Sequence, residues 1–239
     1  MDKAFSAGFA PSPIFTRKAA ARAALVGLSD SYRALLAESF RQFNIETVPV
    51  TVNPVERLHK EKFEACVVAL AEGTDAVLES MRSSPSNSRC IVYGVGGSAQ
   101  EAMRYSKYGI NAVFEEPIDR PSALKVVRST HLLVINELRR YVRVPIVTEA
   151  SVEAANARIP SSTLEVSAGG MSLICSSKLH LGHTVQVSFS LPILNGGNVK
   201  VKASVCWARE NENAYGVRFD ATDDRRLQVK RWIDEYLQI

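Results

Sequence analysis

FEACVVAL, residues 63–70, is the most hydrophobic strand-like run in this 239-residue chain. It is almost continuously apolar rather than alternating, which is typical of a parallel strand covered on both faces. On one side, the stretch 31–43 carries apolar residues along one helical face, and on the other side a second helix is expected at 74–82. This central segment therefore predicts a parallel sheet with helices packed against both of its faces.

The same alternation of strand and helix extends in both directions. It predicts strands at 23–28, 45–52, 63–70, 90–94 and 112–114, and helices at 31–43, 55–62, 74–82, 98–108 and about 121–140. Five strands alternating with five helices predict a doubly wound α/β domain over residues 21–135, after an N-terminal tail at 1–20. This order resembles the receiver domain of two-component regulators, which is flavodoxin-like.

The phosphorylation chemistry of receivers is largely missing from this domain. The position of the acceptor aspartate falls near Ala69, and only Asp30 follows the first strand as a metal carboxylate. Tyr93-Gly94 stands where a hydroxyl residue belongs, and Glu116 replaces the lysine before the proline. An alanine cannot become an acyl phosphate, and a glutamate repels a phosphoryl group. We expect a pseudo-receiver that makes protein contacts, with a homodimer left open.

The second half of the chain has a different pattern of predicted secondary structure. Short β-rich runs lie at 144–148, 162–166, 171–175, 184–191, 199–208 and 215–219, and a helix is expected at 228–237. Asn195-Gly196 between two of the runs is a hairpin signal. Strands at this spacing without intervening helices predict an antiparallel β-barrel, closed by the helix, over residues 136–239.

Two motifs near the start of this barrel carry a family resemblance. RRYVR (139–143) matches an RxxxR pattern, and EVSAGG (165–170) occupies the place of a [D/N]xSxxG pattern. VCW (205–207) and GVRF (216–219) follow in the order of late strands. In this order and context the motifs resemble the PilZ family of bacterial signalling domains. The resemblance implies an effector of the second messenger cyclic di-GMP.

The resemblance also implies roles for individual residues. Arg139 and Arg143 would grip a guanine base and a phosphate, with Arg140 as a neighbouring helper. The cyclic di-GMP site expected from both motifs comprises Arg139, Arg140, Arg143, Glu165, Ser167, Gly169 and Gly170.

Glu165 departs from the family pattern, because the motif opens with aspartate or asparagine in other members. Its longer side chain either readjusts to reach a guanine edge or pairs with Arg143 or Arg139 and fills the site. The first outcome makes the protein a ligand-controlled effector that relays binding to a protein partner by domain rearrangement. The second makes it an adaptor that acts only through protein–protein contacts.

Other functions are disfavoured by composition. The net charge of +4 is too small to indicate a nucleic-acid binder, and the all-β half contains no helix-turn-helix pattern. We expect no enzyme, metal or cofactor, no disulfide, and a cytoplasmic protein without membrane insertion. Alternation predicts that Trp207 and Phe219 lie in the core, and Cys206 reads as a buried thiol.

Overall fold

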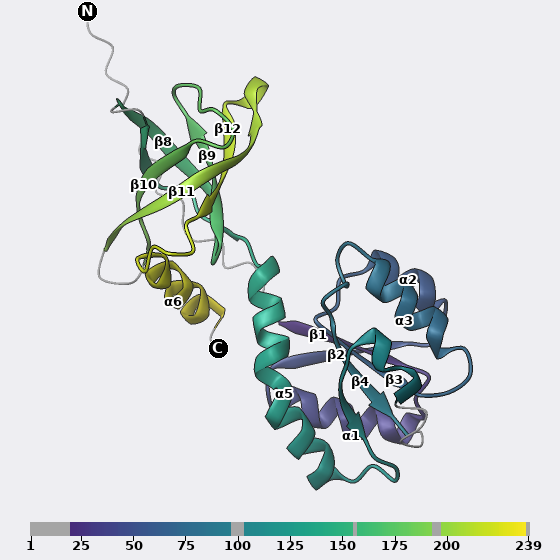
Figure 1. Ribbon diagram of the computed structural model, residues 1–239. Coiled ribbons are helices and arrows are strands. Elements are labelled where there is room, and N and C mark those ends of the chain that lie inside the picture. The colour runs from purple at the N-terminus through teal and green to yellow at the C-terminus, as the bar shows by residue number, and fades with distance from the viewer. Residues whose placement is uncertain (1–19, 97–102, 155–156, 193–196, 238–239) are drawn as a thin grey trace, which may run out of the picture.

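The computed structural model describes residues 20–96, 103–154, 157–192 and 197–237. An α/β domain and a β-barrel are joined by one long helix, α5 (Arg120–Tyr141). Figure 1 shows this helix running along the α/β domain and ending beside the barrel. The predicted fold class, a parallel doubly wound domain followed by an antiparallel barrel with a terminal helix, is confirmed.

The first sheet is parallel and has the strand order β2-β1-β3-β4-β5. Its strands are β1 (Ala21–Val26), β2 (Ile45–Val50), β3 (Ala65–Ala69), β4 (Ile91–Val95) and β5 (Ile110–Phe114). This order, with the first strand between the second and the third, is that of flavodoxin-like and receiver folds.

Helices cover both faces of this sheet. Helix α1 (Asp30–Arg41) packs beside α5, whereas α2 (Pro54–Lys60) packs beside α3 (Thr74–Ser83). Strand β3 is buried between these layers. Its Val67 joins the core under α1 and α5, and Cys66 and Val68 join the core under α2 and α3. The continuous apolar run in the sequence reflects this two-sided burial.

Part of the predicted helix at 98–108 lies outside the described residues. The described remainder includes a short 3₁₀ turn, η1 (Ser106–Tyr108), that ends at Gly109 in the left-handed conformation. At the carboxyl end of the sheet Glu116 lies against Gly96, where a Cβ on the glycine would overlap the carboxylate. Ala69, at the position of a receiver's acceptor, ends β3 close by, and its carbonyl accepts a hydrogen bond from Thr74.

Six antiparallel strands close the barrel in the order β8-β7-β10-β11-β12-β9, and β9 pairs back with β8. They are β7 (Glu149–Ala154), β8 (Ala157–Ser167), β9 (Gly170–Cys175), β10 (Thr184–Ser190), β11 (Asn198–Arg209) and β12 (Ala214–Phe219). The two-residue strand β6 (Val144–Pro145) pairs with the C-terminal end of β8. A second 3₁₀ turn, η2 (Glu210–Glu212), precedes β12.

The sequence patterns missed β7 and the first half of β8. These strands pair along Glu149–Ala154 with Ala157–Ser162, a segment rich in small, polar and charged residues. Their strand conformation is stabilised by the pairing of β7 with β8 and of β7 with β10 rather than by local preference. The predicted Asn195-Gly196 turn includes residues outside those described.

The last helix, α6 (Arg226–Leu237), closes one end of the barrel with Val229, Trp232, Ile233 and Leu237 buried. The apolar core continues from the α/β domain along α5 into the barrel through Val134, Leu138 and Val144. Among the helices of the described residues, none combines the length and the apolar character needed to cross a membrane.

Candidate functional site

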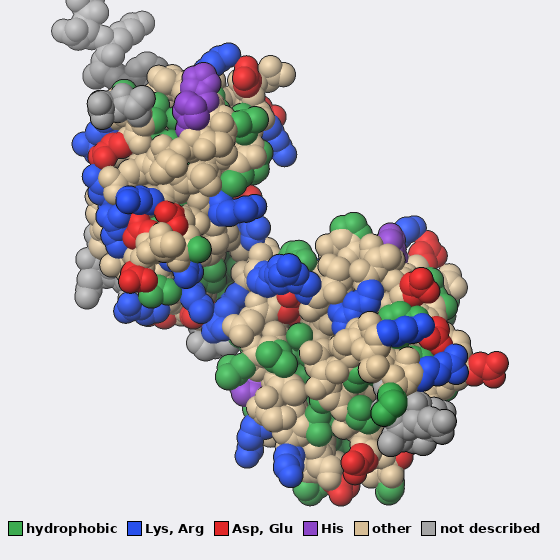
Figure 2. Space-filling model, in the orientation of Figure 1, with side chains coloured by type: hydrophobic (Ala, Val, Ile, Leu, Met, Phe, Trp, Pro, Cys, Tyr) green, Lys and Arg blue, Asp and Glu red, His purple; other side chains and the backbone are tan. Residues whose placement is uncertain are grey.

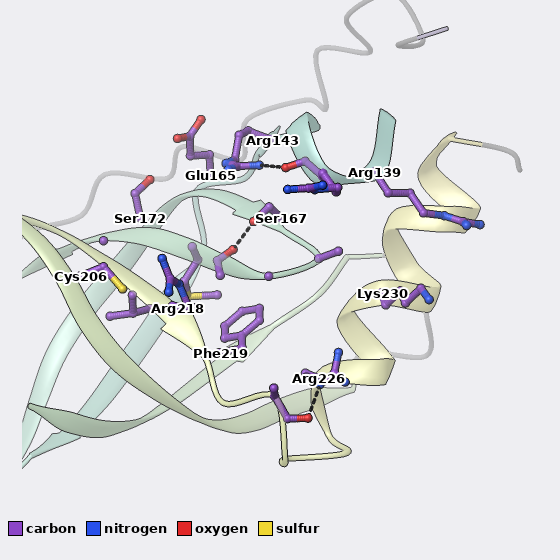
Figure 3. Close-up of a pocket in the computed structure, with 18 of the residues that line it drawn as sticks. Arg139, Arg143, Glu165, Ser167, Ser172, Cys206, Arg218, Phe219, Arg226 and Lys230 are labelled. Atoms are coloured by element: carbon purple, nitrogen blue, oxygen red, sulfur yellow. Dashed lines mark hydrogen bonds between the residues drawn. The ribbon is translucent and has the colours of Figure 1, made fainter. Parts of the chain in front are cut away.

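A cavity of about 750 Å³ lies where the end of α5, the barrel and α6 meet. The seven residues expected from the sequence motifs all line it: Arg139, Arg140, Arg143, Glu165, Ser167, Gly169 and Gly170. Figure 3 shows Arg139 and Arg143 at the end of α5, with Glu165 and Ser167 on the neighbouring strand.

Strand pairing brings the two motifs together. Helix α5 ends at Tyr141, and β6 begins at Val144 after two intervening residues. Val144 pairs with Val166 and Pro145 pairs with Glu165, so the RRYVR segment enters the cavity beside the EVSAGG segment. The buried Val142 and Val144 hold this entry to the core, which leaves Arg143 between them pointing away from it.

The first arginine of the RxxxR motif already has hydrogen-bond and ion-pair partners. Nε of Arg139 donates to Oδ1 of Asp234 on α6 at 2.6 Å, and Nη1 of Arg139 donates to Oδ1 of Asn136 at 2.7 Å. The side chains of Arg139 and Asp234 are both mostly buried, so this ion pair is weakly screened by solvent. It fastens the end of α5 to the terminal helix.

The other two arginines are held more loosely. Nη1 of Arg140 lies 3.5 Å from Oε2 of Glu137, one turn earlier on α5. Nη1 of Arg143 donates to the backbone carbonyls of Arg140, at 3.1 Å, and Val142, at 3.2 Å. Within the described residues Arg143 has no carboxylate partner, so its charge faces the cavity uncompensated.

Glu165 does not fill the site by pairing with an arginine. Within the part of the chain that the structure describes, it forms no ion pair with Arg139 or Arg143. The carboxylate that pairs with Arg139 instead comes from Asp234, on an element that the motif resemblance does not include. The pairing alternative from the sequence is therefore wrong for this structure, and Glu165 remains at the cavity wall.

The turn between β8 and β9 is stabilised by a hydrogen bond between its own residues. The buried hydroxyl of Ser167 donates to the carbonyl of Gly170 at 2.8 Å. Gly170 lies so close to β12 that a Cβ there would overlap the carbonyl oxygen of Val217 and approach Cα of Arg218 to 3.2 Å. Gly169 has open space around it. Ser167 and Gly170 thus shape the turn, and Gly169 leaves room above it.

Thirteen further lining residues were not assigned to the site from the sequence. Among them are Cys206 and Trp207 on β11, Arg218 on β12, and Arg226 and Lys230 on α6. Arg218 was detectable, because it is the exposed residue between the buried Val217 and Phe219. Arg226 and Lys230 are four residues apart and therefore share one face of α6, from which Figure 3 shows both projecting.

Trp207 corrects a sequence prediction. It is 40% exposed at the cavity, whereas Phe219 is buried as predicted, although it also forms part of the cavity lining. The pairing of β11 with β12 shifts register between Val205 and Trp207, and this bulge turns the indole outward. The indole then lies over Gly216, where a Cβ would overlap its ring. Cys206, which was expected to be buried, is exposed, because it follows the buried Val205 and therefore faces outward in the strand alternation.

The cavity is strongly cationic. Six of its lining side chains are positively charged and one, Glu165, is a carboxylate. The positive residues are Arg139, Arg140, Arg143, Arg218, Arg226 and Lys230. Figure 2 shows Lys and Arg side chains gathered around the junction of the two domains on the face in view. This charge distribution suits an anionic ligand with more than one negative group.

Comparison with known proteins gives a family for this half of the chain. The family profile described as "PilZ domain" matches residues 137–237. No curated protein matches the chain in sequence.

Solved structures resemble one half or the other. The chemotaxis response regulator CheY4 of Vibrio cholerae is 12% identical with a TM-score of 0.41, over 46% of this chain and 98% of that one. The PilZ domain of CeSA from a cellulose-synthesizing bacterium is 17% identical with a TM-score of 0.33, over 39% and 96%. The Bacillus subtilis inhibitor of motility MotI/DgrA is 16% identical with a TM-score of 0.33, over 41% and 51%.

These scores are low, and the receiver-like topology is established instead by the strand order of the first sheet. The profile match covers the barrel, both arginine-rich and glycine-rich motifs, and α6. Residues 137–237 are therefore a PilZ domain, of the family of cyclic di-GMP-binding signalling effectors, and they follow a domain with a receiver-like fold.

Proposed function

We propose that this protein binds cyclic di-GMP in the cavity between α5, the barrel and α6, and passes the binding event to a protein partner. The convergence of all seven motif residues on one cationic cavity supports this proposal most directly. A volume of about 750 Å³ is within the range of small-molecule sites.

The chemistry of the lining matches the chemistry of this ligand. Cyclic di-GMP carries two phosphodiester charges and two guanines, each with O6 and N7 acceptors. A guanidinium group can form two parallel hydrogen bonds to a phosphate or to a guanine O6/N7 edge, and it can stack on a base. Arg143 is the first residue we assign to the ligand, because within the described residues it is paired only with backbone carbonyls.

Arg139 and Arg140 would have to exchange partners on binding. Arg139 is paired with Asp234 on α6, and Arg140 with Glu137 on α5. A phosphate that takes these guanidinium groups competes with both carboxylates, so binding would alter how α6 and α5 are held together. This exchange would act as the relay, since rearranged ion pairs between packed elements are a common way to switch their positions.

Glu165 sets the affinity in this proposal. Its carboxylate lines the cavity without an ion pair among the described residues, so it is available to accept N–H groups from a guanine edge. The same negative charge lies near the expected phosphates and opposes them. A misplaced charge-assisted contact costs on the order of 1.5–3 kcal/mol, about ten- to a hundredfold in affinity.

Calorimetric titration of the full chain with cyclic di-GMP tests the proposal. We expect binding by the wild type, loss of it in Arg143→Ala, and tighter binding in Glu165→Asp. Arg158→Ala is the matched control, because Arg158 is an exposed arginine of β8 that does not line the cavity. Failure of both the wild type and Glu165→Asp to bind would contradict the proposal.

A second function is supported by the same ion pairs. Arg139 and Arg140 already have carboxylate partners, which favours a protein that keeps its shape without ligand and acts as an adaptor through protein contacts. This function predicts no binding by the wild type. Binding that appears only in Glu165→Asp would assign the silencing to that single residue.

A further inference from the structure

A buried carboxylate lies at the junction of the two domains, outside the cavity. Glu137 on α5 is 4% exposed and is absent from the cavity lining. Helix α5 follows the last strand of a parallel sheet and returns along it, so its C-terminal end reaches the edge where the strands begin. The segment that precedes β3 lies at this same edge, and it includes Lys62.

Lys62 joins the α/β domain to this carboxylate. Its Nζ donates to Oε1 of Glu137 at 3.1 Å and to the carbonyl of Ser86 at 3.0 Å. The ammonium also lies 3.9 Å from the centre of the Tyr141 ring, at the end of α5. A second carboxylate, Glu64, is 3.9 Å away, and burial raises its pKa. Lys62 therefore holds α5 through both a charge and an aromatic face.

The other carboxylate oxygen of Glu137 contacts an arginine that lines the cavity. Oε2 of Glu137 lies 3.5 Å from Nη1 of Arg140, which lines the cavity and is 44% exposed at its side chain. One carboxylate is thus shared between a lysine of the receiver-like domain and an arginine of the candidate ligand site. A buried carboxylate needs cations that compensate its charge. When its interaction with one cation weakens, its interaction with the other cation therefore becomes stronger.

We propose that Glu137 is a positioning residue for Arg140 and that, through Lys62, it couples the ligand cavity to the receiver-like domain. The ligand in this inference rests on the proposed function. A phosphate that draws Arg140 away leaves Lys62 as the partner of Glu137, and the end of α5 is then held more tightly to the segment before β3. By linkage, any change that weakens Lys62 must also change the affinity of the cavity.

The coupling gives two variants with effects of opposite sign. In Lys62→Met, Arg140 remains as the ion-pair partner of the Glu137 carboxylate. Glu137 then binds Arg140 more strongly, so the affinity of the cavity for the ligand falls. In Glu137→Gln the competitor for Arg140 is gone, so ligand affinity rises. We expect about three- to tenfold in each direction, since changes along a coupling network are modest and Arg140 is partly exposed. A merely structural pair predicts weaker or unchanged binding in both variants.

Calorimetric titration of the full chain with cyclic di-GMP is made on wild type, both single variants and the double variant. In the Glu137→Gln background, Lys62→Met should have no further effect, because the carboxylate that carries the coupling is absent. Lys60→Met is the matched control, since Lys60 pairs with Glu56 on the exposed face of α2. Equal loss of affinity from Lys62→Met in both backgrounds would overturn the inference.

A measurement without ligand separates this inference from the proposed function. In the NMR spectrum of the free protein, the Nε–H signal of Arg140 should move in Lys62→Met, and it should not move on adding Lys62→Met to Glu137→Gln. The signal is assigned by its loss in Arg140→Lys. If the Arg140 signal has the same position in the wild type and in Lys62→Met, the coupling is overturned, even where the ligand binds. A wild type that binds no cyclic di-GMP overturns the proposed function, while this cycle still decides the coupling.

Discussion

Arg139 and Asp234 form an ion pair between the last turn of α5 and the last turns of α6, with 2.6 Å between Nε and Oδ1. The two side chains are 17% and 21% exposed, so the pair is largely withdrawn from solvent. It holds one of the two motif arginines before any ligand is present. The candidate site therefore includes a residue near the end of the chain that competes with the ligand.

Asp234→Asn should increase the affinity for cyclic di-GMP. The substitution keeps a hydrogen-bond acceptor and removes the charge that holds Arg139, so the guanidinium is released to a phosphate. We expect tightening by about two- to tenfold, corresponding to roughly 0.5–1.5 kcal/mol. Titration calorimetry measures it, with the neighbouring exposed Glu235→Gln as the control. Unchanged or weaker binding in Asp234→Asn would show that the pair does not compete.

Gly170→Ala should destabilise the barrel, whereas Gly169→Ala should be tolerated. A Cβ at Gly170 meets the backbone of Val217 and Arg218, which no rotamer change can relieve, and a Cβ at Gly169 meets nothing within 4 Å. Overpacking of this kind costs about 1–3 kcal/mol in the free energy of unfolding. Urea unfolding of both variants measures the difference, and equal stabilities would contradict the tight approach of β9 to β12.

Ligand binding should change the fluorescence of Trp207 and leave that of Trp232 unaltered. Trp207 is 40% exposed at the cavity, while Trp232 is 4% exposed and donates to the carbonyl of Pro192 at 2.8 Å. The ligand-dependent change should disappear in Trp207→Phe and persist in Trp232→Phe. A signal that is lost in Trp232→Phe and kept in Trp207→Phe would contradict this prediction.

Cys206 should be the rapidly modified thiol of the folded protein, and cyclic di-GMP should protect it. Cys206 is exposed at the cavity wall, whereas the other three cysteines are buried. Burial raises the pKa of Cys66 to about 12 and also raises the pKa values of Cys90 and Cys175. Because the thiolate is the reactive form, these three thiols stay unreactive near pH 8 until the protein unfolds.

Disulfide-exchange labelling at that pH, followed by mass spectrometry of the peptides, measures this prediction. One thiol should react quickly, and saturating ligand should slow it. Cys206→Ser should remove the fast phase and leave the slow one. Rapid labelling of Cys66 would contradict the two-sided burial of β3.

The patterns of the sequence predicted the α/β half well. Strand β3 is buried on both faces, so its sequence is continuously apolar, and α1 and α5 are buried on one face, so their apolar residues recur with the helical period. The local sequence of each element therefore indicates how it is buried. In the barrel, β7 gave no such signal, because the paired β8 and β10 stabilise it rather than its own residues. Strand alternation failed at Trp207, because a bulge reversed the side that the indole faces.

The sequence by itself determined the two kinds of domain and the two motifs that meet at the cavity, because periodicity and short motifs are written in neighbouring residues. Only the tertiary structure decided the partners of the arginines. Arg139 and Asp234 are 95 residues apart in the chain, and Lys62 and Glu137 are 75 apart. Their contacts depend on how the barrel closes and where α5 ends against the sheet, and no local pattern encodes such distances.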